Sequence, residues 1–454
     1  MKEQAILQNI EHKLGIVQLN PMQQQVLEKV SPKGDFILYS PTGSGKTLAF
    51  AIPLLKALKH YDRPKLQAVV IAPSRELTMQ IYEIVRSIAN DCKVSCVYGG
   101  HSVQDEIQSL SVIPTILIAT PGRLLDHVQR GRIDLTNTRQ LVIDEFDKCL
   151  ELGFEDEMKR LCRLMPNLSR RVLTSATQLS EIPPYVGFQD HKEFNYLHNN
   201  EQLKQRLKIW KVESVEKDKL NTLQQLLLNL PQGKTIVFAN FREAVTRIFL
   251  HLEAQHISAG IYHGALEQID REKAIDMFNN GSFQVLVSTD LGARGLDIEQ
   301  VEHIVHYHIP TSAEAYTHRN GRTARVNKSG QIYVILHESE HTPDFMKIDD
   351  TFTLQAPPAQ QQIIAAQATI FLAGGKKEKI SKGDILGYFS HHGGIQGSEI
   401  GQIHVHDHYS LVAVPRNKVE AILAQLKPHK IKGQKLKLSI ARPEARLTKD
   451  KAKR

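Results

Sequence analysis

The sequence contains 454 residues, of which 41% are hydrophobic and 23% charged; this is enough apolar material for a sizeable core and too much chain for one ordinary domain. No run approaches the about 18 consecutive apolar residues of a membrane span, and Met1–Leu14 carries charges and glutamines in place of the apolar core of a secretory signal. The four cysteines include no CxxC pair, which argues against a structural zinc site and a disulfide framework. These features predict a cytoplasmic protein of two or three domains with no membrane association.

The net charge of +8 is unevenly distributed. From Gln361 to Arg454 there are 17 Lys and Arg against 7 Asp and Glu, a net +10, which leaves −2 for residues 1–360. A basic segment with its own pattern of elements indicates a polyanionic partner, and nucleic acid is the first candidate.

Short apolar runs alternate with helix-period segments in residues 1–205. The predicted strands are Phe36–Tyr39, Ala68–Ala72, Val94–Tyr98, Thr115–Ala119, Leu141–Ile143 and Arg171–Thr174. The predicted helices between them include Leu48–Lys59, Glu76–Ala89 and Glu155–Leu164. This alternation predicts a parallel sheet covered by helices on both faces.

The glycine-rich stretch Ser40–Thr47 lies between the first predicted strand and the first of these helices. Such a turn directs backbone N–H groups at a phosphate, its lysine adds positive charge, and its last hydroxyl can ligate Mg²⁺. The strict P-loop pattern has glycine where Ser40 stands, so a turn that only caps the helix is the alternative. The strand-turn-helix context favours the phosphate site.

A second run of alternating elements follows a charged connector near Glu213–Lys219. The predicted strands are Thr235–Phe238, Ser258–Tyr262, Val285–Ser288, His303–Tyr307 and Gln331–Ile335. The segment Gln355–Gln367, with two prolines and a Gln/Ala run, is a candidate linker. The sequence therefore predicts a second α/β domain and a separate C-terminal segment.

Acidic residues follow the buried strand Leu141–Ile143, in the order Asp144-Glu145-Phe146-Asp147. Ligands of open parallel sheets bind at the carboxyl ends of the strands. A carboxylate there can hold Mg²⁺ through water, and a neighbouring one can orient an attacking water. A solvated acidic turn is the alternative for this motif alone, and the P-loop about a hundred residues earlier argues against it.

Ordered motifs across both predicted α/β domains resemble those of the DEAD-box RNA helicases. In the first domain they are Pro41–Thr47, Ala72–Leu77, Gly99–Gly100, Thr120–Arg123, Asp144–Phe154 and Ser175–Thr177. In the second they are Val237–Phe238, Gln268 with Arg271, Ser288–Asp297 and His318–Arg325. The resemblance implies two tandem RecA-like domains with ATP and Mg²⁺ as cofactors.

The resemblance also implies roles for individual residues, which agree with what phosphoryl transfer requires: a phosphate cradle, a metal anchor, a water-orienting group and positive charge. The candidate nucleotide-binding residues are Gln23, Thr42, Gly43, Ser44, Gly45, Lys46, Thr47 and Asp297. The candidate catalytic residues are Lys46, Asp144, Glu145 and the family's arginine fingers, Arg322 and Arg325. Thr47 and Asp144 would hold Mg²⁺ through water.

The candidate RNA-binding residues are of types that suit phosphate and 2′-OH more than base edges. They are Arg75, Gly100, Thr120, Arg123, Gln268, Arg271, Thr289 and Arg294, and the candidates for coupling between domains are Asp147, Ser175, Thr177 and His318. The helicase core is therefore expected to bind RNA without regard to sequence. ATP hydrolysis is expected to depend on RNA, because the arginines come from the second domain.

Two positions depart from the family pattern. Gln23 can recognise an adenine edge, but the aromatic residue that stacks on adenine would fall before Met1 and is expected to be missing. Phe146 stands where the family has Ala. We expect activity to be retained, with the Phe146 ring beside the metal edge altering coupling to Ser175 and Thr177.

The C-terminal segment has the βαββαβ order of an RNA-recognition fold and resembles the RNA-binding domain of DbpA-type helicases. Its basic stretch Lys430–Lys437 leads into the last strand, and Phe371 and Tyr409 are the aromatic residues nearest to stacking positions. This resemblance points to ribosomal RNA and large-subunit assembly. His404, His406 and His408 alternate, but three histidines on a flat strand rarely converge on one metal ion.

We therefore expect an α/β protein with two RecA-like domains and a C-terminal RRM-like α+β domain. The expected boundaries are 1–205 for the first helicase domain, 206–354 for the second, 355–367 for the linker, 368–443 for the RNA-binding domain and 444–454 for a basic tail. The expected function is that of a monomeric ATP-dependent RNA helicase. An ATP-gated RNA clamp that unwinds little is one alternative, and a DNA translocase is another.

Overall fold

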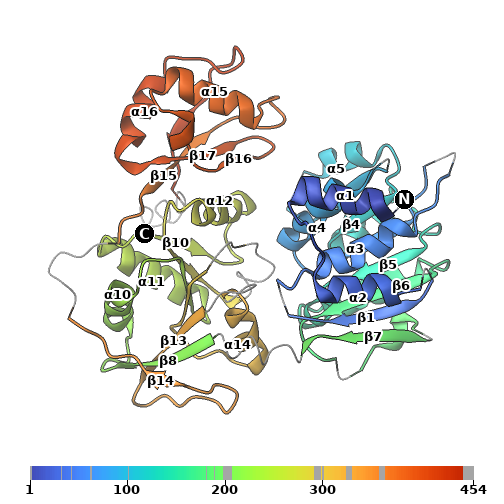
Figure 1. The fold of residues 1–454 in the computed structure, drawn as a ribbon, viewed down its shortest axis with the longest axis horizontal. Coiled ribbons are helices and arrows are strands. Elements are labelled where there is room, and N and C mark those ends of the chain that lie inside the picture. The colour runs from blue at the N-terminus through green and yellow to red at the C-terminus, as the bar shows by residue number, and fades with distance from the viewer. Residues whose placement is uncertain are drawn as a thin grey trace. The chain divides into compact units, whose positions relative to one another are not determined.

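The computed structural model describes the chain except for residues 1–2, 32, 42, 62–63, 91, 101, 180, 189, 198–206, 291–297, 299–300, 324–329, 357–362 and 443–454. The chain divides into two compact units, with the boundary after residue 205, and each unit is described by itself. Figure 1 shows one α/β domain in the first unit, and an α/β domain with a small C-terminal domain in the second. No helix among the described residues is long and apolar enough to cross a membrane.

A parallel sheet forms the centre of the first unit. Its strands are β1 (Asp35–Tyr39), β2 (Ala68–Ile71), β3 (Val94–Val97), β4 (Ile116–Ala119), β5 (Gln140–Ile143), β6 (Arg170–Ser175) and β7 (His191–Asn195). They lie in the order β3-β4-β2-β5-β6-β1-β7, with parallel pairing throughout. Strands β1, β2, β4 and β5 are buried along their whole length, as expected when helices cover both faces.

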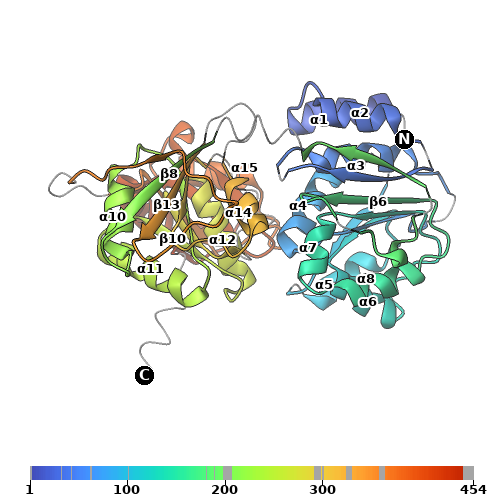
Figure 2. The ribbon, with the colours of Figure 1, turned by 90° about the horizontal axis from the view of Figure 1, so that it is seen from below.

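Helices cover both faces of this sheet (Figure 2). The first face carries α1 (Glu3–Leu14), α2 (Pro21–Lys29), α3 (Lys46–Lys56) and α4 (Arg75–Ile88); the second carries α5 (Val103–Leu110), α6 (Pro121–Gln129), α7 (Phe146–Glu151) and α8 (Glu155–Arg163). Successive side chains of a strand point to opposite faces, so Leu38 of β1 joins the first cluster and Tyr39 joins the second.

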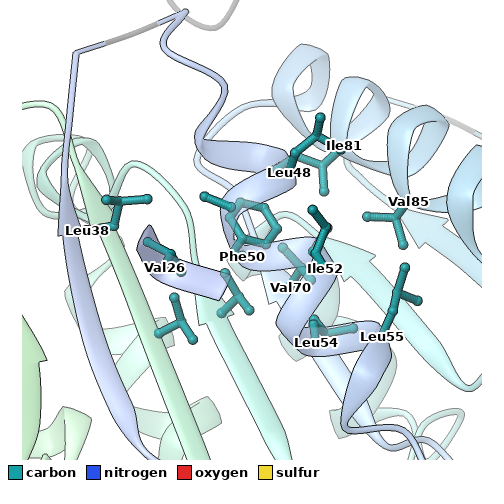
Figure 3. Close-up of a cluster of buried hydrophobic side chains, with 14 of the residues drawn as sticks. Val26, Leu38, Leu48, Phe50, Ile52, Leu54, Leu55, Val70, Ile81 and Val85 are labelled. Carbon is teal, nitrogen blue, oxygen red and sulfur yellow. The ribbon is translucent and has the colours of Figure 1, made fainter. Parts of the chain in front are cut away.

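Helix α3 lies at the centre of the first cluster. Figure 3 shows Phe50, Ile52 and Leu55 of α3 packed among Val26 of α2 and Ile81 of α4. Each of these five side chains is at most 1% exposed. This packing fixes the helix that begins at the end of the glycine-rich turn, so the turn is anchored at both of its ends.

The second unit repeats the architecture. Its strands are β8 (Leu207–Ser214), β9 (Thr235–Phe238), β10 (Ala259–Tyr262), β11 (Val285–Ser288), β12 (His303–His306), β13 (Gly330–His337) and β14 (Asp350–Thr351). They form a parallel sheet in the order β10-β11-β9-β12-β13-β8-β14. Its described helices include α10 (Leu220–Asn229), α11 (Arg242–Ala254), α12 (Gln268–Asn279) and α14 (Ala313–Asn320).

The C-terminal domain is a four-stranded antiparallel sheet with two helices on one face (Figure 1). Its elements are β15 (Gln367–Leu372), α15 (Lys382–His392), β16 (Ile403–Val405), β17 (Ser410–Pro415), α16 (Val419–Leu426) and β18 (Leu438–Ile440), in the sheet order β16-β17-β15-β18. This confirms the predicted fold class of two parallel-sheet domains and a small α+β domain. The βαββαβ chain order is as predicted.

The strands missing from the prediction lie at or next to sheet edges. Strand β7 buries only Phe194 among its five residues, so its sequence lacks the alternation of a half-buried strand. Strand β8 reaches Ser214 and thus includes the start of the segment predicted to be a connector. Six of the thirteen residues of the predicted linker, 357–362, lie outside the described residues, and its last residue, Gln367, opens β15.

Candidate ATP and RNA sites

The loops at the carboxyl edge of the first sheet fall into two groups, set by the strand order. The predicted nucleotide motifs follow β1, β5 and β6, which are neighbours. The predicted RNA motifs follow β2, β4 and β3, which are neighbours in the other half of the sheet. One edge therefore carries two adjacent groups of motif residues.

The glycine-rich turn has the backbone of a phosphate cradle. Gly43 and Gly45 have φ of 78° and 89°, values that favour glycine. Lys46 opens α3, is 7% exposed, and its Nζ donates to the carbonyl oxygens of Ser40 at 2.7 Å and Pro41 at 3.3 Å. These two hydrogen bonds hold the lysine charge next to the glycine-rich turn.

The segment that opens α2 supports the turn from outside. Asn20 and Gln23 form a reciprocal capping box, with both hydrogen bonds at 2.9 Å. The amide of Gln23 also donates to the Gly45 carbonyl at 3.0 Å, and that of Asn20 donates to the Ser44 carbonyl at 2.9 Å. A Cβ on residue 45 would lie 2.5 Å from Nε2 of Gln23, so the contact requires glycine there. Gln23, predicted to read adenine, thus uses both ends of its amide within the protein.

Asp144 and Glu145 follow β5 directly and are 3% and 8% exposed. The hydroxyl of Thr174 donates to Oδ1 of Asp144 and accepts the backbone N–H of Glu145 at 3.1 Å. Burial raises the pKa of Asp144, and the charge of Lys46 opposes that rise. A desolvated carboxylate beside a second carboxylate is a donor set that a hard divalent cation suits, so these residues fit Mg²⁺.

Asp147 is tied to the loop after β6. The hydroxyl of Thr177 donates to Oδ2 of Asp147 at 2.9 Å, and that of Ser175 donates to the Thr177 carbonyl at 2.6 Å. The three predicted coupling residues of the first domain therefore form one hydrogen-bonded group. A movement of Asp147 would therefore displace Thr177 and Ser175 at the end of β6.

The Phe146 side chain is part of a hydrophobic core. The residue is fully buried among the apolar side chains of the second face, which include Ile143 and Cys149. The expectation that this ring alters coupling to Ser175 and Thr177 stays a prediction. Phe146 is the first residue of α7, and it is buried together with the next three residues of that helix.

The other half of the edge brings the first-domain RNA candidates together. The guanidinium of Arg75 lies over Gly99 and Gly100, and a Cβ on Gly100 would lie 2.1 Å from its Nη1. Thr120 caps α6 without using its hydroxyl for the cap. Arg123 pairs with Glu106 at 2.6 Å.

Glu106 was not predicted to matter, yet it is the anchor of this half. It is 2% exposed, and its carboxylate also contacts His127 at 2.8 Å and accepts the backbone N–H of Tyr98 at 3.0 Å. Burial opposes ionisation, but the hydrogen bonds and Arg123 lower the pKa of Glu106 overall. Glu106 lies in the mostly polar helix α5, and no sequence motif marks it as a buried residue.

The described candidates of the second domain lie on α12, after β11, and in or after α14. Gln268 and Arg271 open α12, where Arg271 donates to Oε1 of Gln268 at 2.7 Å. Thr289 follows β11 and is 7% exposed. His318 and Arg322 lie in and after α14 and are 8% and 2% exposed.

A buried arginine beside them, Arg319, joins the ends of three strands, β9, β11 and β12, and was not predicted to have a role. It is 1% exposed and forms a two-pronged pair with Asp290, at 2.5 and 2.7 Å. It also donates to Oδ1 of Asn240 and to the carbonyl of His308, both at 2.7 Å. Its Nη1 lies 3.2 Å from Nδ1 of His306. Arg319 lies within the sequence motif His318–Arg325, but only the fold shows which residues it contacts.

Exposed lysines gather on two adjacent loops of the C-terminal domain. Lys432 donates to the carbonyl of Lys379 at 2.9 Å, which joins the loop after β15 to the loop before β18. The exposed lysines of the two loops and the first turn of α15 are Lys376, Lys377, Lys379, Lys382, Lys427, Lys430, Lys432, Lys435 and Lys437. We call them the lysine loops. The basic surface is thus larger than the predicted stretch Lys430–Lys437.

The alternating histidines meet carboxylates. His406 Nε2 lies 2.6 Å from Asp276, His404 lies 3.3 Å from the same carboxylate, and His408 lies 3.0 Å from Glu378. Among the described residues these histidines do not converge into a metal-binding group.

Comparison with known proteins agrees with this geometry. Residues 20–182 match the DEAD/DEAH box helicase family, residues 218–327 the helicase conserved C-terminal domain, and residues 369–440 the DbpA RNA binding domain. The chain is 34% identical to the ATP-dependent RNA helicase DbpA of Escherichia coli (strain K12) over 433 residues, which is 93% of this chain and 94% of the relative. The chain belongs to the DEAD-box ATP-dependent RNA helicases of the DbpA type.

Other DEAD-box helicases extend the comparison. The DbpA of Bacillus subtilis (strain 168) is 28% identical over 466 residues, covering 94% of this chain and 96% of the relative. The solved structure of S. cerevisiae Dbp5 bound to RNA and ADP BeF3 matches with a TM-score of 0.64 and 26% identity, over 74% of this chain and 88% of that one.

Four of the predicted helicase residues lie outside the described residues. They are Thr42, Arg294, Asp297 and Arg325. Their assignments stay predictions, like those of the other site residues.

Proposed function

We propose that this protein is a cytoplasmic, monomeric RNA helicase that couples ATP binding and hydrolysis to separation of structured RNA, with ribosomal RNA of the large subunit as its leading substrate. The observation that carries the proposal is the pairing of two motif groups on one sheet edge. Lys46, Asp144 and Glu145 lie in one half, and Arg75 and Thr120 lie in the other. Family membership supports both assignments.

In the proposed reaction the first domain holds ATP. The turn Gly43–Thr47 and the Lys46 charge bind the phosphates, and Thr47 and Asp144 are the residues that would hold Mg²⁺ through water. Bound Mg²⁺ would supply charge neutralisation for the phosphates. Glu145 orients the attacking water, and Arg322 and Arg325 stabilise the developing charge when RNA and ATP bring the domains together.

Adenine recognition in this proposal uses the free hydrogen-bonding capacity of Gln23. Its amide accepts from the Asn20 backbone and donates to the Gly45 carbonyl, which leaves one oxygen lone pair and one N–H for an adenine edge. The state of the phosphate turn and the recognition of the base are thereby linked. Hydrolysis of other nucleotides would accordingly be weak.

RNA specificity is assigned to the C-terminal domain. The core candidates suit backbone contacts, whereas the net +10 of the last segment and the lysine loops supply a surface for a folded RNA. The match of residues 369–440 to the DbpA RNA binding domain supports this assignment.

The test measures release of a labelled strand from an RNA duplex attached to a ribosomal RNA fragment, with and without ATP. We expect ATP-dependent release, and faster release than from a scrambled attachment of the same length. Stimulation of ATP hydrolysis by RNA but not by polydeoxynucleotides is expected in parallel. ATP-stabilised RNA binding without release would instead indicate an RNA clamp, and equal stimulation by DNA would contradict an RNA helicase.

A further inference from the structure

The two central strands of the C-terminal sheet, β15 and β17, have buried residues on both faces. Ile370 and Val412 point to α15 and α16, and neighbouring residues on the same strands must point the other way. Yet Thr369, Leu411 and Ala413 on that other face are at most 1% exposed. In an RNA-recognition fold this second face is the usual site for stacking bases, so something else covers it here.

Helix α12 of the second helicase domain is what covers it. Figure 1 shows α12 against the sheet on the side away from α15 and α16. The side chain of Thr369 accepts from Asn280 at 2.9 Å and lies 2.7 Å from the hydroxyl of Ser282, just past the helix end. Arg416 donates to the carbonyls of Ser282 and Gln367, at 2.7 and 2.8 Å, and so bridges the two domains.

The aromatic side chains of this face are part of the contact. Tyr409 stacks on Phe371 and on His406, with ring centroids 5.6 and 4.4 Å apart. The ammonium of Lys273 from α12 lies 4.9 Å from the Phe371 ring, a cation–π distance. Tyr409 is only 6% exposed. Both rings nearest to base-stacking positions therefore contact protein, with Tyr409 buried and Phe371 half-buried.

Polar contacts give the surface its complementarity. His406 meets Asp276 of α12 at 2.6 Å, and the hydroxyl of Tyr409 donates to Oε2 of Glu272 at 2.8 Å. The second oxygen of Glu272 accepts from Gln268 at 3.0 Å, and Gln268 accepts from Arg271 at 2.7 Å. A continuous chain of hydrogen bonds thus runs from the C-terminal domain to two candidate RNA-binding residues of the core.

We propose that this sheet face is a docking surface for α12, and that Tyr409 is a positioning residue for Gln268 and Arg271. The RNA-binding surface of the C-terminal domain is then the lysine loops. Docking itself is independent of the proposed function, whereas the role of Gln268 and Arg271 in binding RNA rests on it. RNA binding by a C-terminal domain fixed in this way would act on α12, the helix that carries Gln268 and Arg271.

Docking is tested by hydroxyl-radical footprinting of the full chain without RNA, which reports side-chain exposure. We expect Tyr409 and Leu411 to be modified slowly in the unaltered protein. Asp276→Lys places a cation against His404 and His406, and should raise modification of both residues at least about threefold, whereas Asp276→Lys with His406→Glu restores an ion pair and should bring protection back. Fast modification in the unaltered protein, or no response to Asp276→Lys, would overturn docking.

Positioning is tested with Tyr409→Phe, which removes one hydroxyl and keeps the ring stack. We expect the KM for generic RNA in the ATPase assay to rise roughly 3- to 10-fold with kcat unchanged at saturating RNA. The control is Tyr388→Phe, which removes a hydroxyl bonded to the Leu426 carbonyl within the same domain and should leave that KM unchanged. Equal values for the two variants would overturn the role of Tyr409, while absence of RNA stimulation in the unaltered protein would instead reject the proposed function.

Discussion

Glu145 has a φ of 47°, a left-handed conformation that costs a residue with a side chain about 1–3 kcal/mol and recurs at functional sites. The conformation holds the carboxylate where β5 gives way to α7. The Thr174 hydroxyl fixes the backbone on one side. A strained residue kept by its neighbours is consistent with a role in orienting water.

Glu145→Gln keeps the size of the side chain and removes its charge. We expect RNA-stimulated kcat to fall by roughly 10²- to 10⁴-fold, because that is the range that a positioned general base contributes, while ATP and RNA still bind. Steady-state ATPase and nucleotide titrations measure the two effects. Glu155→Gln, at an exposed position in the first turn of α8, is the control, and near-normal turnover in Glu145→Gln would reject the assignment.

Asp290→Asn leaves the buried Arg319 guanidinium without its charge partner. Breaking a buried ion pair from one side costs about 3–5 kcal/mol, so the second domain should lose stability by that order. Trp210, the single tryptophan of the sequence, lies in β8 and reports unfolding of this domain by fluorescence. Asp218→Asn breaks the exposed pair with Arg247 and should cost no more than about 1 kcal/mol; similar losses in the two variants would contradict the buried network.

His306 makes the stability of the same domain depend on pH. Burial and the neighbouring Arg319 lower the pKa of His306 to about 3. An unfolded histidine titrates near about 6.5, so between these values the unfolded chain binds a proton that the folded chain does not. Stability is therefore lost as the pH falls, by up to about 1.4 kcal/mol per pH unit for this group. Urea unfolding followed by Trp210 at pH 7, 6 and 5 measures the slope, which should be shallower in His306→Gln.

At the scale of elements, α7 links the acidic loop to the core through Phe146. The helix places Asp147 within hydrogen-bonding distance of Thr177, and it places the Phe146 ring in the hydrophobic cluster of the second face. At the departure from the family residue, the side chain thus contributes to core packing. Its effects should appear in the stability of the first domain.

Phe146→Ala should destabilise the first domain by about 3–5 kcal/mol, because truncating a buried Phe leaves a cavity. Phe146→Leu fills most of the space and should cost much less. Calorimetry of the full chain measures which unfolding transition shifts to a lower temperature. The rate of ATP hydrolysis, measured at a low temperature at which the domain remains folded, tests the ATP site. Full stability in Phe146→Ala combined with altered unwinding per ATP would instead return the ring to a coupling role.

At the scale of the whole molecule, the net positive charge is concentrated in the C-terminal part of the chain. Residues 1–360 carry a net −2, and residues 361–454 carry a net +10. With the sheet face covered by α12, the lysine loops offer that charge to RNA. Affinity and its salt dependence should therefore respond to these lysines together.

Replacing Lys430, Lys435 and Lys437 with Gln tests this. Each lost phosphate contact should reduce the slope of log affinity against log salt by about 0.7 to 0.9, so the triple variant should lose about 2 to 3 and any preference for a ribosomal RNA fragment over its scrambled control. Titrations at several salt concentrations measure both. A triple variant at Lys13, Lys33 and Lys159, exposed in the first domain, has the same net charge and should keep the preference; matching slopes in the two variants would contradict the assignment.

The sequence by itself determined the two parallel-sheet domains, the order of the C-terminal elements and the nucleotide motifs. These features are local: buried strands are short apolar runs, and Gly43, Gly45 and Lys46 mark a turn whose backbone only certain residues can adopt. Edge strands such as β7 escaped because a strand that buries one residue has no periodicity to detect.

Only the tertiary structure decided the partners of residues far apart in the chain. Arg319 with Asp290, Gln23 with Gly45, and Tyr409 with Glu272 are pairs separated by 29, 22 and 137 residues, and no local pattern encodes such a meeting. It likewise decided that Phe146 faces the core and that α12 covers the aromatic face of the C-terminal sheet. The physical reason is that burial and hydrogen bonding depend on which surfaces the fold brings together, and a single sequence records only the residues that supply them.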